Sequence, residues 1–392
     1  MRFKILALFA VASWLASTIN AQSFNSGSTG ADGALNLMNP GVVLFDPQSF
    51  TPPLNPKGDN IFHFKTITIG PGVTVRLSGR NLHNPVFWLV QGDVRIDGTI
   101  DLSGDDSKPY SSGTPRVPTS SGAGGHDGGV GALNGNIAQP GFGPGGGGLD
   151  HGGTSTANKL LVPLVGGSGG GGSATASGGG GGGALLIASS TSITINGTIS
   201  ADGGNQTAEQ FPTTGGSGGA IRLVAPLITG SGATLTAKGG TASGGVSSGA
   251  DGQLRLEAFV NDLRGFTNGT PLSIGKPFKL FLPADPGPSV RIISAGGQAV
   301  QTGASGDVDI PKAQLNISGP ATLTIEAHHV EPGTVIKLHL YGDDQEDRTV
   351  LSTPLTGTFD TSYSTVSAPL TSGVTHVYVE AEWTTASAKT PP

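Results

Sequence analysis

The chain contains no cysteine among its 392 residues, and only 12% of its residues are charged. Without cysteine there is no disulfide framework and no lipidated thiol, so packing alone must hold the fold together. The charged share is about half of the usual share of about 25%, and the acids behind the formal charge of −6 are scattered. No cluster of Lys and Arg with aromatic neighbours occurs, so we expect no nucleic-acid partner.

Long apolar runs are also missing, and the apolar stretch at the N-terminus is short. Arg2 and Lys4 precede a mostly apolar run from Ile5 to Ala16, and small and polar residues follow as far as Ala21. About 12 residues are too few to span a bilayer, which needs roughly 20. The pattern predicts a signal peptide over residues 1–21, a secreted or cell-surface protein, and no membrane span once the peptide is removed.

Glycine is the residue in excess. It supplies 67 of the 392 residues, more than twice the usual share of about 7%. Glycine is a poor helix former, and a sparsely charged chain offers few residues for the solvated faces of helices. The composition therefore favours an all-β fold with many turns.

A pattern of short strands repeats through the middle of the chain. Apolar residues recur at every second position in four segments, 61–77 (IFHFKTITIGPGVTVRL), 94–104 (VRIDGTIDLSG), 193–204 (ITINGTISADGG) and 227–240 (LITGSGATLTAKGG). A denser apolar strand precedes the last three of them, at Val86–Val90, Ala184–Ala188 and Ala220–Ala225, and Gln253–Phe259 closes the series. Corresponding positions lie 36 residues apart between Ala184 and Ala220 and 33 apart between Gly219 and Gly252.

This spacing suits one supersecondary unit stacked on the next, because two short strands cannot bury an apolar face alone. The repeats predict a short right-handed β-solenoid, similar to a parallel β-helix, over residues 22–282. A two-sheet sandwich built from the same strands is the alternative. In either fold we expect Gly98 and Gly197, in the Asp-Gly and Asn-Gly pairs, to adopt positive φ at a corner or a hairpin turn.

Glycine-rich insertions interrupt the repeats at one corresponding place. The longest covers residues 104–183, and shorter ones follow the third and fourth segments. Insertions of this kind project from one side of a stack, which we expect to be the functional face. They form either flexible loops or a bundle of polyproline II strands, in which missing side chains let backbones pack closely and bond to each other.

The insertions resemble the glycine-rich tips of certain phage tail-fibre adhesins and the glycine-rich antifreeze proteins. Over nearly its full length the mature chain resembles an uncharacterised family of secreted, glycine-rich bacterial proteins. The likeness is carried by VFWLVQGDVRIDGTIDLSG, GGGGALLIASSTSITINGTISADGG and GGSGGAIRLVAPLITGSGATLTAKGG. It implies secretion and brings no catalytic residues to this chain.

A different pattern begins after the proline-rich segment 283–288, which we predict to be a linker. The glycine runs stop there, and about seven short alternating strands follow in roughly 100 residues. They predict an immunoglobulin-like or fibronectin-like β-sandwich over residues 289–385, followed by a disordered tail over 386–392. This fold is a common secreted spacer and binding module and says little about chemistry.

Acidic residues of the second repeat are the candidates for catalysis. Asp93, Asp97 and Asp101 are evenly spaced, and Asp105 and Asp106 follow. Paired carboxylates along a groove can act as acid and base in the cleavage of polysaccharides. The matching positions of the next repeat hold Ser192, Asn196 and Ser200, so the charges belong to one repeat only.

One acidic loop is a candidate for metal binding. Asp343, Asp344, Glu346 and Asp347 lie in the sequence GDDQED. Carboxylate and backbone oxygens of such a loop can bind calcium, but the spacing is not that of an EF-hand, and a solvated turn is the alternative. The chain has no phosphate-binding GxxxxGKS motif, no nucleophile elbow and no HExxH motif, so we expect no cofactor.

Three functions remain open. The first is a secreted or cell-surface structural and adhesive protein that presents its glycine-rich loops to a polysaccharide or another cell-surface component. The second is a carbohydrate-active enzyme, a hydrolase or lyase of the β-helix type, that uses Asp93, Asp97 and Asp101. The third is an ice-binding or surface-binding protein, since Thr66, Thr68, Thr74 and Thr194 alternate with core residues.

Overall fold

The computed structural model describes residues 23–55, 57–110, 116–132, 136–207, 213–242, 247–283, 288–300, 313–315, 319–342, 347–370 and 375–381. The predicted signal peptide, most of the predicted linker and the predicted tail lie outside this part of the chain. The described residues are nearly all β, and their helical element is a single turn of 3-10 helix, η1 (Pro47–Ser49). Among them, no helix is long and apolar enough to cross a membrane.

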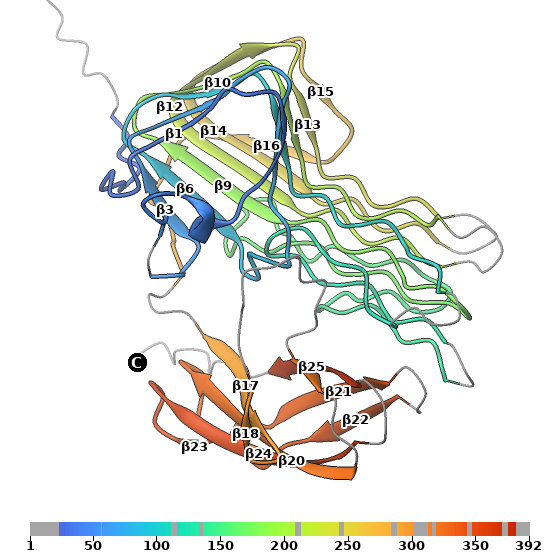
Figure 1. The fold of residues 1–392 in the computed structure, drawn as a ribbon. Helices are drawn as coiled ribbons and strands as arrows, with labels where there is room; N and C mark the ends of the chain where they lie inside the picture. Colours follow the sequence, from blue (N-terminus) through green and yellow to red (C-terminus); the bar gives the residue numbers. More distant parts are fainter. Residues whose placement is uncertain are drawn as a thin grey trace, which may run out of the picture.

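The first part of the chain forms parallel sheets. Its strands are β1 (Ala34–Leu37), β2 (Gly41–Leu44), β3 (Ile61–Phe64), β4 (Thr66–Ile69), β5 (Val73–Arg76), β6 (Val86–Val90), β7 (Val94–Ile96), β8 (Thr99–Asp101), β9 (Ala184–Ser189), β10 (Ser192–Ile195), β11 (Thr198–Ser200), β12 (Ala220–Ser231), β13 (Thr234–Thr236), β14 (Gln253–Arg264), β15 (Thr267–Asn268) and β16 (Leu272–Gly275). They form a ten-stranded and a six-stranded sheet, and corresponding strands of successive repeats lie side by side (Figure 1).

The register confirms the correspondence predicted between repeats. Ala220 pairs with Ala184 of the preceding repeat and with Gln253 of the following one. The long strand β12 pairs with β9 near its start and with β10 near its end, and β14 runs beside it. Because β12 connects the row β1-β4-β7-β10 to the row β9-β6-β3, these strands form one nearly closed sheet.

The corners between strands correct one expectation. The strands on either side of Gly98, β7 and β8, belong to different sheets, so the Asp-Gly pair forms no hairpin. The prediction of positive φ was also wrong, because neither Gly98 nor Gly197 has a positive φ. A Cβ atom at Gly197 would instead lie 1.9 Å from the carbonyl oxygen of Gly98. Glycine is needed here because the backbones of stacked corners touch.

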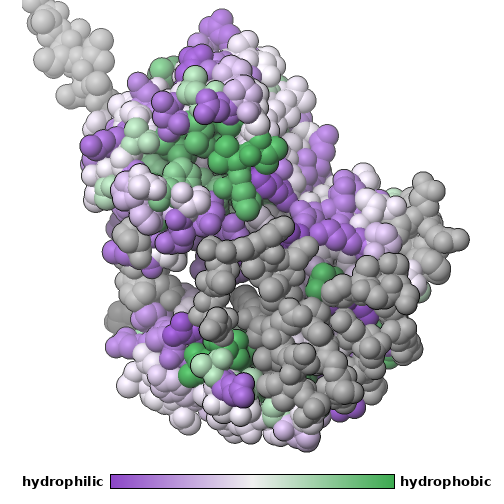
Figure 2. Space-filling view, viewed as in Figure 1, coloured by the Kyte–Doolittle hydropathy of each residue, from purple (hydrophilic) through white to green (hydrophobic). Residues whose placement is uncertain are grey.

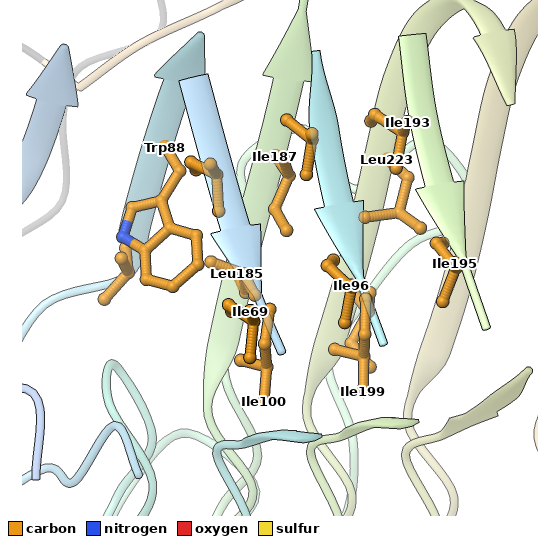
Figure 3. Close-up of a cluster of buried hydrophobic side chains, with 14 of the residues drawn as sticks. Ile69, Trp88, Ile96, Ile100, Leu185, Ile187, Ile193, Ile195, Ile199 and Leu223 are labelled. Atoms are coloured by element: carbon orange, nitrogen blue, oxygen red, sulfur yellow. The ribbon is translucent and has the colours of Figure 1, made fainter. Parts of the chain in front are cut away.

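Apolar side chains stack in columns inside the parallel sheets. Ile69, Ile96 and Ile195 occupy one column, and Trp88, Ile187 and Leu223 occupy another; all six are fully buried (Figure 3). Ile100 and Ile199 pair in the same way across the six-stranded sheet. The period-two pattern places these residues inward, and burial of each stabilises the stack by about 1.5–3 kcal/mol.

The last part of the chain forms antiparallel sheets. Its strands are β17 (Ser289–Ala295), β18 (Gln298–Ala299), β19 (Ala313–Leu315), β20 (Gly319–His328), β21 (Ile336–Gly342), β22 (Arg348–Leu351), β23 (Thr356–Gly357), β24 (Ser362–Leu370) and β25 (Thr375–Ala381). One sheet has the order β18-β17-β20-β24-β23, and the other has the order β19-β25-β21-β22. Ile325 of the first sheet and Leu338 and Val377 of the second belong to one buried cluster, so the sheets share a core.

The first repeat leaves apolar side chains in contact with solvent. β2 forms one end of the six-stranded sheet, and its Val42 and Leu44 are 76% and 51% exposed. Figure 2 shows hydrophobic residues gathered on one face of the parallel-sheet part, with hydrophilic residues around them. The surface of the stack is thus not uniformly polar.

Candidate functional site

The three acids predicted for catalysis are held separately by neighbouring side chains. Asp93 precedes β7 and accepts hydrogen bonds from Thr191 and Ser192 at 2.7 and 2.8 Å. These bonds lower the pKa of Asp93 below its ordinary value. The three acids do not share one face, because Asp97 follows β7 at the corner between the two sheets and Asp101 ends β8 in the other sheet.

The other two acids also have partners of their own. Asp97 binds Arg95 at 2.6 Å and the side-chain amide of Asn196 at 2.8 Å. Asp101 forms an ion pair with Arg76 at 3.0 Å. Four of these five partners, Thr191, Ser192, Asn196 and Arg76, belong to an adjacent repeat, so the carboxylates act as links between repeats.

A similar polar ladder continues into the glycine-rich region. Asp106 accepts hydrogen bonds from the backbone and side-chain amides of Asn205, and Asn205 accepts bonds from Thr241 of the next repeat. Asp202 likewise accepts bonds from Thr236 and from the backbone of Lys238. Acids and amides at matching places in successive repeats therefore hold the stack together.

Asp105 has three cationic neighbours. Its carboxylate binds Arg76 and Arg80 at 2.9 Å each, and Lys108 lies 3.6 Å away. Arg76 also connects Asp105 to Asp101. The structure thus brings two of the predicted acids together, but it does so through a shared arginine.

Asp347 of the predicted calcium loop is used in an ion pair. Both of its carboxylate oxygens lie 2.7 Å from the guanidinium of Arg116. Asp343, Asp344 and Glu346 lie outside the described residues, so the calcium hypothesis stays a prediction. Within the described ranges, no group of three or more His, Cys, Asp or Glu side chains is placed to hold a metal ion.

Residues 178–183 occupy the centre of the glycine-rich region, and their amides point to three neighbouring segments in turn. Gly178 and Gly181 donate to segment 126–129, Gly179 and Gly182 to 214–217, and Gly180 and Gly183 to 102–105, over 2.7–3.1 Å. The partner therefore repeats every three residues, as expected for a polyproline II helix, which has three residues per turn and no internal hydrogen bonds. A β-strand would alternate between two sides.

The same six glycines face three further segments where side chains would lie. An added Cβ atom would come within 2.0–2.6 Å of carbonyl oxygens in segments 167–170, 201–204 and 120–123, again in turn. Real Cβ atoms do not approach so closely, so no other residue type fits. The central segment thus has six close neighbours, and Figure 1 shows the glycine-rich segments running side by side away from the sheets. This packing favours the bundle over the flexible loop.

A buried group of three charges, which was not predicted from the sequence, lies on the outer face of the parallel sheets. Arg222 of β12 donates two hydrogen bonds to Glu257 of β14, at 3.0 and 3.2 Å. Arg255 donates a third at 2.6 Å. Glu257 is 0% exposed, and the guanidinium of Arg222 lies 4.7 Å from the ring centre of Phe278. One carboxylate therefore neutralises one of two buried cations and binds both.

Arg116 connects the glycine-rich bundle to the C-terminal sheets. Its fully buried guanidinium donates to the carbonyl of Gly131 in the bundle and to the carbonyl of Gly342 at the end of β21. The bidentate ion pair with Asp347 completes this contact, and the backbone amide of Asp347 donates to the side chain of Asn136 at 2.9 Å. The two parts of the chain thus meet through paired polar groups.

Aromatic side chains surround this contact. Tyr110 and Val130 of the bundle pack with Tyr341 of β21, and burial raises the pKa of Tyr110 to about 12. Phe142 of the bundle stacks on Tyr378 of β25 with ring centres 5.4 Å apart. The interface therefore combines apolar burial with an ion pair.

Replacing Arg116 with alanine should release the C-terminal sheets from the bundle. In the intact contact, Asp347 would be buried without a counter-charge, which costs about 3–5 kcal/mol. This cost favours separation of the C-terminal sheets from the bundle. We expect calorimetry to show one unfolding transition in the wild type and two in the variant, with a larger hydrodynamic radius. Arg264→Ala, at an exposed ion pair with Asp262, is the control and should leave both measurements unchanged. A single transition in Arg116→Ala would contradict the expected role.

His328 forms a hydrogen-bonded group on the five-stranded sheet. Its Nε2 atom lies 2.9 Å from Glu326 of the same strand, and Arg291 of β17 binds the same carboxylate. The hydrogen bond with Glu326 raises the pKa of His328 above 6.5 and lowers that of Glu326 below 4.5. The charged pair therefore stabilises the fold between these two values. Its contribution is lost as pH rises through the raised pKa of His328 or falls through the lowered pKa of Glu326.

An NMR titration of the His328 ring protons should give a midpoint above pH 6.5. In Glu326→Gln the midpoint should fall, because the charged acceptor is gone. Glu331→Gln, at a nearby turn, is the control and should leave the midpoint of His328 where it is. Equal midpoints in the wild type and in Glu326→Gln would show that the pair has no electrostatic role.

Threonines form a rank across the six-stranded sheet. Thr74 of the predicted set leads it, and the in-register partners on the following strands are Thr99, Thr198, Thr234 and Thr267. Successive hydroxyls lie one strand apart, about 4.8 Å. The other predicted threonines, Thr66, Thr68 and Thr194, lie on the ten-stranded sheet, where Arg95 separates Thr68 from Thr194.

The described part of the chain thus offers three features for function: the glycine-rich bundle, its contact with the C-terminal sheets, and the rank of threonines. None of them joins a nucleophile, a base and an orienting group, the arrangement that nucleophilic catalysis requires. No family model, no curated protein and no solved structure matches this chain.

Proposed function

We propose that the chain is a secreted or cell-surface structural and adhesive protein. In this proposal the parallel repeats are a right-handed β-solenoid, the glycine-rich segments are a polyproline II bundle, and the antiparallel sheets are an immunoglobulin-like sandwich. The solenoid is a rigid stalk, and the bundle with the sandwich presents the contact surface.

The observation that carries the proposal is the six-neighbour packing of residues 178–183. A bundle of this kind is stiff and almost free of side chains, so it can hold the side chains at its margins in fixed places. Those margins include Phe142 and the contact with the C-terminal sheets. The predicted catalytic acids support the same function, because they link repeats to each other.

Mixing the predicted mature chain, residues 22–392, with surface and plant polysaccharides tests the proposal. We expect size-exclusion chromatography to show a complex of larger size with at least one polymer, and no loss of polymer length. Shortening of a polymer that Asp93→Asn, Asp97→Asn or Asp101→Asn abolishes would support the carbohydrate-active enzyme instead. The adhesive function would be contradicted if the protein formed no complex with any polymer and also failed to adhere to cells.

The rank of threonines supports a second candidate, an ice-binding or surface-binding protein. Regularly spaced hydroxyl and methyl groups on a parallel sheet match the repeats of an ordered solid. In this case the protein should show thermal hysteresis, and Thr198→Lys, in the middle of the rank, should abolish it. Thr356→Lys on β23 is the control. Absence of thermal hysteresis in the wild type would exclude ice binding.

A further inference from the structure

A small pocket lies where the glycine-rich bundle meets the C-terminal sheets. Its volume is about 210 Å³, and its walls are residues 139–143 of the bundle and His339, Tyr341 and Glu380 of β21 and β25. Pockets for drug-sized ligands measure about 300–1,000 Å³, so this one has room for a single small ring. Two parts of the chain far apart in sequence are needed to form it.

The bundle side of the pocket is fixed by backbone hydrogen bonds. The amide of Gly141 donates to Gly147 at 2.8 Å, and the amide of Phe142 donates to Asp127 at 3.0 Å. Phe142 packs against two paired residues of the sheet, with Tyr378 stacked on it and the ring of His339 perpendicular to it at 5.6 Å. The ring therefore has a defined position.

The sheet side of the pocket provides both hydrogen-bond donors and hydrogen-bond acceptors. His339 Nε2 lies 2.9 Å from Glu380, and Thr349 lies 3.2 Å from the other ring nitrogen. The hydrogen bond from His339 lowers the pKa of Glu380, so this carboxylate is ionised at neutral pH and accepts hydrogen bonds. The amide side chain of Gln139, on the opposite wall, can both donate and accept.

We propose that this pocket binds one neutral hexopyranose unit at the end of a polysaccharide. A sugar ring has C–H faces, which pack on aromatic rings such as the partly exposed ring of Phe142. It also has hydroxyl groups at its edge, which bond to carboxylate and amide groups such as Glu380 and Gln139. None of the residues that line the pocket is Lys or Arg, and Lys337 is already paired with Glu380 at 3.7 Å, so the pocket does not favour acidic sugars. The inference rests on the proposed adhesive function and gives it a ligand class.

Isothermal titration calorimetry with glucose, galactose and mannose, and with dextran, galactan and mannan, tests this site on residues 22–392. We expect the wild type to bind one of these neutral sugars and its polymer, and to bind alginate more weakly. In Glu380→Gln, which keeps the shape of the side chain, and in Phe142→Leu, the affinity should fall at least tenfold. Tyr363→Leu removes an exposed aromatic ring from the other sheet and should bind as the wild type does.

The melting temperature of each variant shows whether it is folded, and Glu380→Gln decides the matter if Phe142→Leu unfolds. Undiminished binding by a folded Glu380→Gln would overturn the site while leaving the adhesive function intact. Failure of the wild type to bind any neutral sugar would also overturn it, and adhesion to cells would then show that the adhesive function uses another ligand.

Discussion

Replacing Gly181, at the centre of the bundle, with alanine should strongly destabilise the protein. The new Cβ atom would lie 2.2 Å from the carbonyl oxygen of Gly167 and 2.5 Å from its carbonyl carbon. Overpacking a rigid interior typically costs about 1–3 kcal/mol. Backbone atoms cannot rotate away as a side chain can, so we expect the upper end of this range or more in the free energy of unfolding measured in urea.

Gly92→Ala is the matched control, because it adds the same methyl group outside the bundle. Its nearest neighbour would be the carbonyl oxygen of Lys65 at 3.2 Å, and a shift of a few tenths of an ångström relieves this contact. Neither glycine has positive φ, so the comparison isolates the close approach of backbones. Equal stability of the two variants would mean that the central segment is not packed as described.

Replacing Glu257 with glutamine should have the second large effect. The variant keeps the shape of the side chain but leaves Arg222 and Arg255 buried without a counter-charge. Breaking a buried ion pair by removing one partner costs about 3–5 kcal/mol, and two cations lose their partner here. We expect thermal denaturation to begin well below the melting temperature of the wild type.

Asp262→Asn on the same strand is the control for this variant. Asp262 also pairs with an arginine, Arg264, but both side chains are largely exposed, so the melting temperature should not change measurably. Replacing Arg222, Glu257 and Arg255 together with apolar residues should restore much of the stability, since no buried charge remains. A wild-type melting temperature in Glu257→Gln would show that the three charges are hydrated.

The repeats were predictable because they depend on local patterns. Alternation of apolar residues along 94–104 and 193–204 places Ile96 and Ile195 inward, and the 36-residue spacing aligns Ala184 with Ala220. Each strand carries this information in a few neighbouring residues. The order of the strands follows once each repeat is stacked on the next.

The polar contacts were harder to predict, for two different reasons. Arg116 and Asp347 are 231 residues apart, and nothing in either neighbourhood indicates the other. Arg222 and Arg255, in contrast, occupy matching positions in successive repeats, with Glu257 two residues further on. The repeat spacing could have revealed this group, had polar residues inside the apolar strands been compared between repeats.

The glycines of the corners and of the bundle show a third reason. In the sequence, a glycine required for positive φ and a glycine required for close backbone approach look the same. Gly72 has a φ of +76°. Gly98 has no positive φ, but a Cβ atom added to it would lie 2.4 Å from the carbonyl oxygen of Gly70. Only the three-dimensional packing separates the two cases.

Hydrogen exchange of the amides of residues 178–183 tests the ordered glycine-rich bundle most directly. Each of these six amides donates to a different acceptor in the surrounding segments. All six should be protected to the same degree as the amides of β9 in the core of the parallel sheets. Exchange at the rate of an unstructured glycine-rich peptide would contradict the bundle and, with it, the proposed rigid contact surface.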